Sequence, residues 1–511
     1  MMFNPKTAAS SPKPVVRNGW VRKSDLDAWL DRYLPVPTQV ISNEEYTPIP
    51  QTPQQRRLEK ELIAQADAHA LRLGTDRRSF LRTSCGMALA FATMNSVFGH
   101  FFRVDASELT EPFAVAENNP HVFIFDVQTH HVAMPSQAPH ADQAFLQALL
   151  SLRGTARRMN PALKDRAPMI EDIYLENYIK EVFLDSETDL VALSALPGTS
   201  EETDVLTPDV LYKSRAWIND VTRSPRVISH GYFSPDLGQQ NLESMHAQME
   251  KIKVDAWKGY TGVARAKGKE GWRLDDESVA YPALQLARKQ GVKNICVHKG
   301  LPFPGDPNWW SPMDVPRAAK DFPELNFLVY HSGFRDLQES LPAAADGFKT
   351  NSHVPWVSDL CAWKKKNPQV NNIYMEMGST FALMVSASPM LAAHVLGMII
   401  DAFGDDHLLW GTDSVWWGSP QWQIEAFRRL EMPAELTQRF SWKPLTADVK
   451  RKVFGLNAAR VYGVDPAAKR NPMPANYVEK LRNWYKQSAA PTPSHTQYGW
   501  VRADSLTASG I

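Results

Sequence analysis

Short apolar runs recur along the middle of the chain, and segments with helical spacing separate them. In chain order the runs cover residues 121–127, 190–194, 227–229, 252–257, 294–297, 326–330, 373–376 and 408–411. Apolar residues recur at helical spacing in the intervening segments 241–251, 277–290, 315–321, 389–403 and 421–430. Strands that alternate with helices favour parallel pairing with helical crossovers.

Eight such units indicate an α/β protein built as a (β/α)₈ TIM barrel, whose active site lies at the C-terminal ends of the strands. A doubly wound open sheet is the competing topology, but no Gly-rich phosphate loop follows the first run. We expect the barrel to occupy residues 117–465.

Extensions flank this predicted barrel on both sides. Residues 1–75 are polar and contain a helical pattern at 54–73, and the Pro-, Ser- and Thr-rich tail 466–511 has a shorter one at 477–485. The sequence Gly-Trp-Val-Arg occurs at 19–22 and again at 499–502. This echo is consistent with tails that pack on the same surface.

A possible export signal lies between the N-terminal extension and the barrel, at residues 76–116. The string Asp76-Arg77-Arg78-Ser79-Phe80-Leu81-Arg82 resembles the twin-arginine motif, and Ala114-Val115-Ala116 offers a small-x-small cleavage site. The apolar stretch 85–98 is too short to span a bilayer. The resemblance implies a periplasmic protein; the alternative is a cytoplasmic protein with an amphipathic helix here.

Composition excludes some classes of partner. The 511 residues carry 56 basic and 56 acidic side chains, so no net field attracts nucleic acid or anionic lipid. The three cysteines cannot form a disulfide framework, and Cys296 is expected to be buried and inert within a strand.

Polar residues with catalytic potential follow four of the predicted strands. His130, His298, His331 and Asp413 each stand at or just past the end of a run. A catalytic metal needs about three protein ligands and one open position. His130, His298 and Asp413 could supply the ligands, while His331 could act as general acid or base. Metal coordination would make hydroxide available at neutral pH, and Asp413 could also accept a proton.

Several motifs resemble the amidohydrolase-related family, the aminocarboxymuconate semialdehyde decarboxylase-like group of metal-dependent TIM-barrel hydrolases and decarboxylases. The motifs are Phe125-Asp126-Val127-Gln128-Thr129-His130, Val297-His298, Tyr330-His331-Ser332-Gly333, Leu409-Trp410-Gly411-Thr412-Asp413 and the closing stretch 452–463. The resemblance spans residues 120–465. It implies His130, His298 and Asp413 as metal ligands and His331 as the acid–base residue.

The chain departs from that family in three places. Gln128 stands where a further histidine is usual, so either it is a weak fourth ligand beside three others or metal affinity has been lost. His131 cannot replace it without a bulge, because consecutive strand residues point to opposite sides. Residues 414–417 replace a usual proline two positions after Asp413, and Glu376 stands near a usual aspartate.

Four further residues are candidates for substrate binding. Lys258 and His230 end two other strands, and Trp416 and Trp417 follow Asp413. Lys258 could contact a substrate carboxylate or form an ion pair, and the two tryptophans could stack on a ring or seal the mouth.

The sequence therefore predicts a metal-dependent hydrolase that acts through metal-bound hydroxide. Its substrate would be a small carboxylate-bearing or aromatic ester, lactone or amide. A non-oxidative decarboxylase of an aromatic or unsaturated acid is one alternative, and a metal-free, non-catalytic barrel that binds a ligand or partner is another. One divalent ion is expected, zinc before manganese or iron. We expect a small-molecule substrate, a homo-oligomer, no nucleic acid and no stable membrane span.

Overall fold

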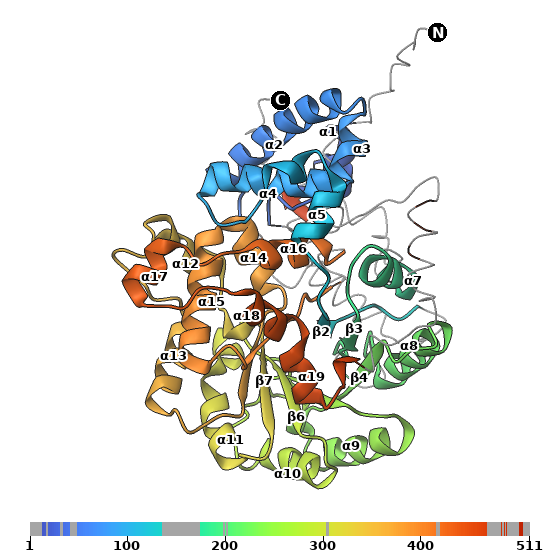
Figure 1. Cartoon of the computed structure of the whole chain (residues 1–511). Helices are drawn as coiled ribbons and strands as arrows, with labels where there is room; N and C mark the ends of the chain where they lie inside the picture. The colour runs from blue at the N-terminus through green and yellow to red at the C-terminus, as the bar shows by residue number, and fades with distance from the viewer. Residues whose placement is uncertain are drawn as a thin grey trace.

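The computed structural model describes residues 13–16, 19–30, 34–40, 49–134, 174–197, 200, 203–302, 306–414, 419–467, 482, 485, 487 and 500–503. Within these ranges the chain forms an eight-stranded sheet, a two-stranded sheet and the surrounding helices (Figure 1).

The large sheet is a closed parallel barrel. Its strands lie in chain order: β2 (Phe125–Thr129), β3 (Leu190–Leu193), β4 (Val227–Tyr232), β5 (Ala256–Tyr260), β6 (Asn294–His298), β7 (Asn326–Tyr330), β8 (Ile373–Glu376) and β9 (Leu408–Leu409). The chain beyond β9 returns to β2, since Val127 N donates to Trp410 O at 3.0 Å and Asp413 N to Gln128 O at 2.9 Å. The expected (β/α)₈ barrel is confirmed, and the open doubly wound sheet was the wrong alternative.

Two strands are displaced from their predicted positions, whereas β7 and β8 begin and end where the sequence predicts. β2 begins at Phe125 and not at residue 121. β5 occupies Ala256–Tyr260 and not 252–257. The prediction for β5 started too early because Ile252 and Val254, just after α9, are apolar residues that pack into the main core.

Helices surround the barrel and fill the crossovers. They are α7 (Leu175–Ile179), α8 (Pro208–Val221), α9 (Gln239–Lys251), α10 (Tyr281–Lys289), α11 (Val315–Asp321), α12 (Leu337–Ala345), α13 (Val357–Lys366), α14 (Thr380–Ala387), α15 (Pro389–Phe403), α16 (Gln421–Arg429), α17 (Ala434–Phe440), α18 (Ala447–Arg451) and α19 (Asn457–Tyr462). The segments predicted at 315–321 and 389–403 coincide with α11 and α15.

The last of these helices, α19, closes the end of the barrel opposite the candidate site. Asn457 Nδ2 donates to the carbonyl of Leu408, the first residue of β9, at 2.9 Å. Ala458 and Ala459 pack with the barrel interior, which also contains the fully buried Cys296. Tyr462 reaches inward from the same helix.

Helices from the N-terminal part of the chain gather at one end of the molecule (Figure 1). They are α2 (Pro53–Arg72), α3 (Arg77–Leu81), α4 (Ser84–Phe98) and α5 (Pro112–Asn118), and the 3₁₀ turn η1 (Ala106–Leu109) precedes α5. The helical pattern predicted at 54–73 is thus confirmed as α2.

The predicted signal segment forms α3, α4 and α5 and contacts the barrel. Phe91 of α4 belongs to the core cluster that also contains Phe427 and Leu430. Arg103 N donates to Arg429 O at 3.0 Å, and Glu431 N donates to Phe101 O at 2.8 Å. Export stays a prediction. Across the described ranges, no helix combines the length and the apolar character needed to cross a bilayer.

The two Gly-Trp-Val-Arg segments pair with each other. Trp20–Arg22 (β1) and Trp500–Arg502 (β10) form an antiparallel pair centred on Val21 opposite Val501. Both valines are buried together with Leu26 of α1 (Lys23–Leu30). The idea that this echo marks paired tails is confirmed, while the helix predicted at 477–485 lies outside the described residues apart from Arg482 and Tyr485.

Candidate active site

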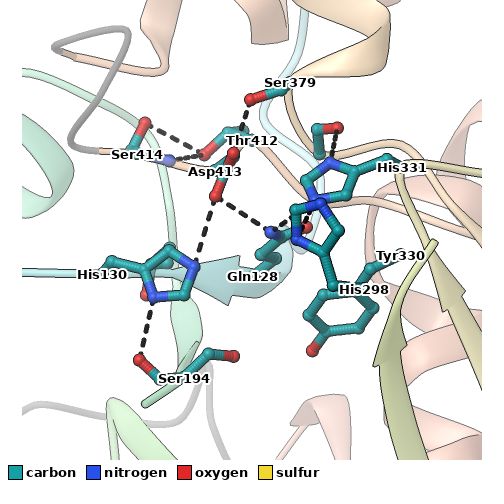
Figure 2. Close-up of polar contacts among 12 residues, drawn as sticks. Gln128, His130, Ser194, His298, Tyr330, His331, Ser379, Thr412, Asp413 and Ser414 are labelled. Atoms are coloured by element: carbon teal, nitrogen blue, oxygen red, sulfur yellow. Dashed lines mark hydrogen bonds and ion pairs between the residues drawn. The ribbon is translucent and has the colours of Figure 1, made fainter. Parts of the chain in front are cut away.

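Gln128 and His130 stand two residues apart at the C-terminal end of β2, and alternation along a strand sends such side chains to the same side. The register between β2 and β3 shifts between Asp126 and Thr129, and bulges of this kind re-aim side chains near active sites. Gln128 and His130 therefore share the mouth (Figure 2), whereas His131 points away from it, with its Nε2 2.9 Å from Ser214 Oγ. Burial lowers the pKa of His131 to about 4.

His130 and Asp413 come together directly. His130 Nδ1 lies 2.8 Å from the carbonyl oxygen of Ser194, so Nδ1 carries the proton and donates it. His130 Nε2 then faces Asp413 Oδ1 at 3.3 Å (Figure 2). Burial alone would raise the pKa of Asp413, but the contact with His130 and the nearby imidazoles hold that pKa below its usual value. Ser379 Oγ donates to the second oxygen of Asp413.

His331 is oriented by the loop that follows β8. Its Nδ1 lies 2.8 Å from Gly378 O, so this nitrogen donates and Nε2 faces the site. Nε2 is 3.2 Å from His298 Nδ1 and 3.5 Å from Gln128 Nε2. Burial lowers the pKa of His331 to about 4, although Asp413 opposes that shift. The imidazole is therefore neutral at pH 7.

Gln128 stands between Asp413 and His331 (Figure 2). Its amide nitrogen donates to Asp413 Oδ1 at 2.9 Å. Its amide oxygen is buried and has no hydrogen-bond partner within the part of the chain that the structure describes. Leaving such an acceptor unpaired costs about 1–3 kcal/mol. This atom is the exception in a cluster that is otherwise well hydrogen-bonded.

His298 completes the cluster and has aromatic neighbours. The rings of Trp310 and Tyr260 lie 4.9 Å and 5.3 Å from the imidazole, centroid to centroid. Burial, followed by the charges of His331 and Lys258, lowers its pKa well below the usual value. Gln128, His130, His298, His331 and Asp413 are all between 0% and 2% exposed.

Glu376 supports the cluster from beneath, a role the sequence analysis did not assign. One carboxylate oxygen accepts from His331 N at 3.0 Å, and the other accepts from Gly378 N. A Cβ on Gly411 would approach Glu376 Oε1 to 1.6 Å, so glycine is required there. Burial raises the pKa of Glu376 well above its usual value. The position of Glu376 at the end of a predicted strand could be seen in the sequence, but the close contact between Glu376 and Gly411 could not.

The four predicted substrate-binding residues occupy different places. Lys258 is buried within the barrel, and its ammonium lies 3.5 Å from the Tyr330 ring centroid and 4.8 Å from that of Tyr260. His230 is also fully buried and is directed to Tyr462 beneath the mouth. Trp416 and Trp417 lie outside the described residues.

The chemistry of the donor set fits a divalent ion, although the side chains form a hydrogen-bonded cluster. Two ligands of a tetrahedral zinc ion, each about 2.0–2.2 Å from the metal, are roughly 3.3 Å apart, and His130 Nε2 and Asp413 Oδ1 are 3.3 Å apart. The unpaired oxygen of Gln128 adds a third donor of suitable type. Among the described residues, no three His, Cys, Asp or Glu side chains are grouped closely enough to hold an ion. Gln128 nitrogen separates Asp413 from the other two histidines.

Sequence comparison finds a match to one family. Residues 240–464, somewhat less than half of the chain, match the family model described as Amidohydrolase. This match agrees with the resemblance that the motifs indicate, and the prediction of an amidohydrolase-type enzyme is confirmed at that level. The match includes His298, His331 and Asp413 but not Gln128 or His130. No curated protein matches the chain.

Three solved structures with a similar fold are distant from this chain in sequence. An uncharacterised TIM-barrel protein from Bordetella bronchiseptica is 15% identical, with a TM-score of 0.41 over 68% of this chain and 100% of its own. The 5-carboxyvanillate decarboxylase of Sphingomonas paucimobilis is 14% identical, with a TM-score of 0.42 and coverages of 68% and 100%. A probable 2-pyrone-4,6-dicarboxylic acid hydrolase from Acinetobacter baumannii is 11% identical, with a TM-score of 0.38 and coverages of 66% and 99%.

Proposed function

We propose that the protein is a metal-dependent hydrolase of a small carboxylate-bearing or aromatic ester, lactone or amide. One observation carries the proposal: Gln128, His130, His298, His331 and Asp413 come from four separate segments and meet in one buried cluster at the barrel mouth. Buried polar side chains without a structural role are expensive. The matched family is consistent with this chemistry.

His130, Asp413 and His298 would hold the ion, and Gln128 would add its oxygen once its amide turns over. Imidazole and carboxylate ligands suit zinc, while the additional oxygen would also suit manganese or iron. A bound divalent ion polarises a carbonyl group and lowers the pKa of a water molecule. The Ser194 carbonyl accepts from His130 Nδ1, so Nε2, on the side of Asp413, is the nitrogen that would coordinate the ion.

His331 would move the proton. Its Nδ1 donates to Gly378 O, so the lone pair on Nε2 is directed into the cluster. As a water oxygen forms a bond to the substrate carbonyl carbon, His331 Nε2 takes the water proton. It then returns that proton to the leaving oxygen or nitrogen as the acyl bond breaks. Glu376 fixes the backbone from which His331 extends.

The surroundings of His298 support the substrate class. Tyr260 and Trp310 present aromatic rings beside it, and rings of this type pack against planar substrates. The ammonium of Lys258 provides positive charge in the same part of the barrel and would favour an anionic substrate.

The test combines metal loading with two substrate panels. The purified full-length protein is loaded with Zn²⁺, Mn²⁺ or Fe²⁺, and its metal content is measured. It is then assayed with aromatic lactones and esters for ring opening or hydrolysis, and with hydroxylated aromatic acids for release of CO₂. Hydrolysis that is lost in His331→Asn supports the proposal.

Two outcomes would overturn it. CO₂ release without hydrolysis would assign the decarboxylase alternative, which uses the same donor set. The metal-free binding barrel would be favoured if less than about a tenth of the molecules carried metal after loading. We set this threshold well below the full occupancy expected of a working site.

A further inference from the structure

A chain of hydrogen bonds runs beneath His130 through the interior of the barrel. Barrel interiors are normally filled by branched apolar side chains, and much of this one is. A series of hydrogen-bonded polar residues is therefore unusual in this interior.

This series consists of three consecutive contacts. His130 Nδ1 donates to Ser194 O at 2.8 Å. Ser194 Oγ lies 2.8 Å from His230 Nδ1. His230 Nε2 in turn lies 3.0 Å from the hydroxyl of Tyr462, which belongs to the closing helix α19. The path thus joins the candidate metal ligand to the opposite end of the barrel.

His230 is suited to be the middle of this chain. It is 0% exposed and lies below the mouth, so it bridges Ser194 and Tyr462 and does not line the open part of the site. A neutral imidazole has one donor and one acceptor. When Ser194 Oγ donates to Nδ1, Nε2 donates to Tyr462, and the Tyr462 hydroxyl can then donate to Cys296 Sγ at 3.5 Å.

Ser194 is the residue through which His230 would act on the site. It directly follows β3, which ends at Leu193. Its N–H donates to Thr129 O at 3.0 Å, and its carbonyl holds His130. Without the contact from His230, its side chain would lose the only hydrogen-bond partner that it has among the described residues.

We propose that His230 is a positioning residue: through Ser194 it fixes the orientation of His130, with Nδ1 donating to the Ser194 carbonyl, and Tyr462 anchors it from α19. Outer partners of metal-binding histidines set which ring nitrogen is free to coordinate, and their loss typically lowers metal affinity about 10–100-fold. The proposal rests on the proposed function only in taking His130 to be a metal ligand.

The direct test reads the hydrogen bond from His130 Nδ1. Protein labelled with ¹⁵N-histidine is examined by imidazole ¹H–¹⁵N NMR, and the His130 signals are identified by their loss in His130→Gln. We expect an Nδ1–H signal that exchanges slowly with solvent in the wild-type protein and one that exchanges fast in His230→Leu. His230→Gln, which keeps a donor and an acceptor, should restore slow exchange.

A second variant and a control guard against general misfolding. Tyr462→Phe removes one oxygen and should speed the exchange of the His130 Nδ1 proton less than His230→Leu does. His394→Leu replaces a buried, hydrogen-bonded histidine on α15, away from the site, and should leave His130 unchanged. Slow exchange of the His130 Nδ1 proton in both folded His230→Leu and Tyr462→Phe would overturn the proposal.

Metal binding separates this proposal from the proposed function. In a chelator competition with Zn²⁺, the apparent affinity of His230→Leu should fall about 10–100-fold. Wild-type protein that binds no Zn²⁺ would count against the proposed function, while the exchange of the His130 Nδ1 proton would still decide the role of His230. Wild-type Zn²⁺ affinity in His230→Leu would overturn the role assigned here.

Discussion

Replacing Glu108 by alanine should strongly destabilise the protein, because this residue ties the N-terminal helices to the barrel. Its Oε2 lies 2.6 Å from Arg429 Nη2, and the two side chains are 3% and 0% exposed. Glu108 also accepts hydrogen bonds from the side-chain amides of Asn118 and Asn119, at 3.3 Å and 3.2 Å. The carboxylate is therefore enclosed by donors.

The expected cost follows from the burial of Arg429. Removing one partner of a buried ion pair typically costs about 3–5 kcal/mol, because a charge is left in a dry environment. Arg429 would keep Glu425 at 3.0 Å and the carbonyl of Arg103 at 3.1 Å. We therefore expect the lower end, about 3 kcal/mol, out of a total stability of about 5–15 kcal/mol for a typical protein.

Urea unfolding followed by circular dichroism measures this loss. Asp67→Ala is the matched control, since Asp67 pairs with Arg77 at 3.1 Å but the two side chains are 55% and 22% exposed. An exposed pair is worth about 0–1 kcal/mol. A loss below about 1 kcal/mol for Glu108→Ala, no larger than that of an exposed pair, would refute the reasoning and imply loosely attached helices.

Three further predictions concern the site and the edge of the barrel. Gln128→His should raise the Zn²⁺ content of purified protein, because imidazole is a better ligand than a neutral amide; unchanged content by elemental analysis would place residue 128 outside the ligand set. Gly411→Ala should destabilise the protein by about 1–3 kcal/mol through overpacking, since its Cβ would meet Glu376; wild-type stability in urea would contradict this. His121 has a pKa raised to about 9: burial opposes the shift, but hydrogen bonds to Asp189 and Glu187 outweigh it. Its contribution is complete below about pH 6.5, its unfolded-state pKa, and is lost as the pH rises through 9, so the stability difference between wild type and His121→Ala should shrink between pH 6 and 9.5.

The sequence was a good guide to the barrel because burial on both faces leaves continuous apolar runs. β7 and β8 were located to the residue for this reason. β5 was misplaced because Ile252 and Val254 are equally apolar but belong to the turn before the strand. Apolar character reports burial, and both a strand and the turn leading into it can be buried.

The candidate site was predictable in its composition but not in its internal contacts. Strand ends identified His130, His298, His331 and Asp413, since parallel strands bring their C-terminal ends to one rim. His230 points toward Tyr462 because of the depth at which each residue lies in the barrel. The strand register sets that depth, and the sequence does not reveal it. The same holds for Ser194, whose carbonyl has no signature in the chain.

The pairing of β1 with β10 makes the two ends of the described chain a single unit. Val21 and Val501 lie opposite each other at the centre of the antiparallel pair and are buried together, so β1 and β10 are each other's strand partners. Shortening the protein at residue 465, a natural choice for isolating the barrel, would expose Val21 and leave β1 without hydrogen-bonded neighbours. A trimmed version for crystallisation or engineering should therefore lose both ends together.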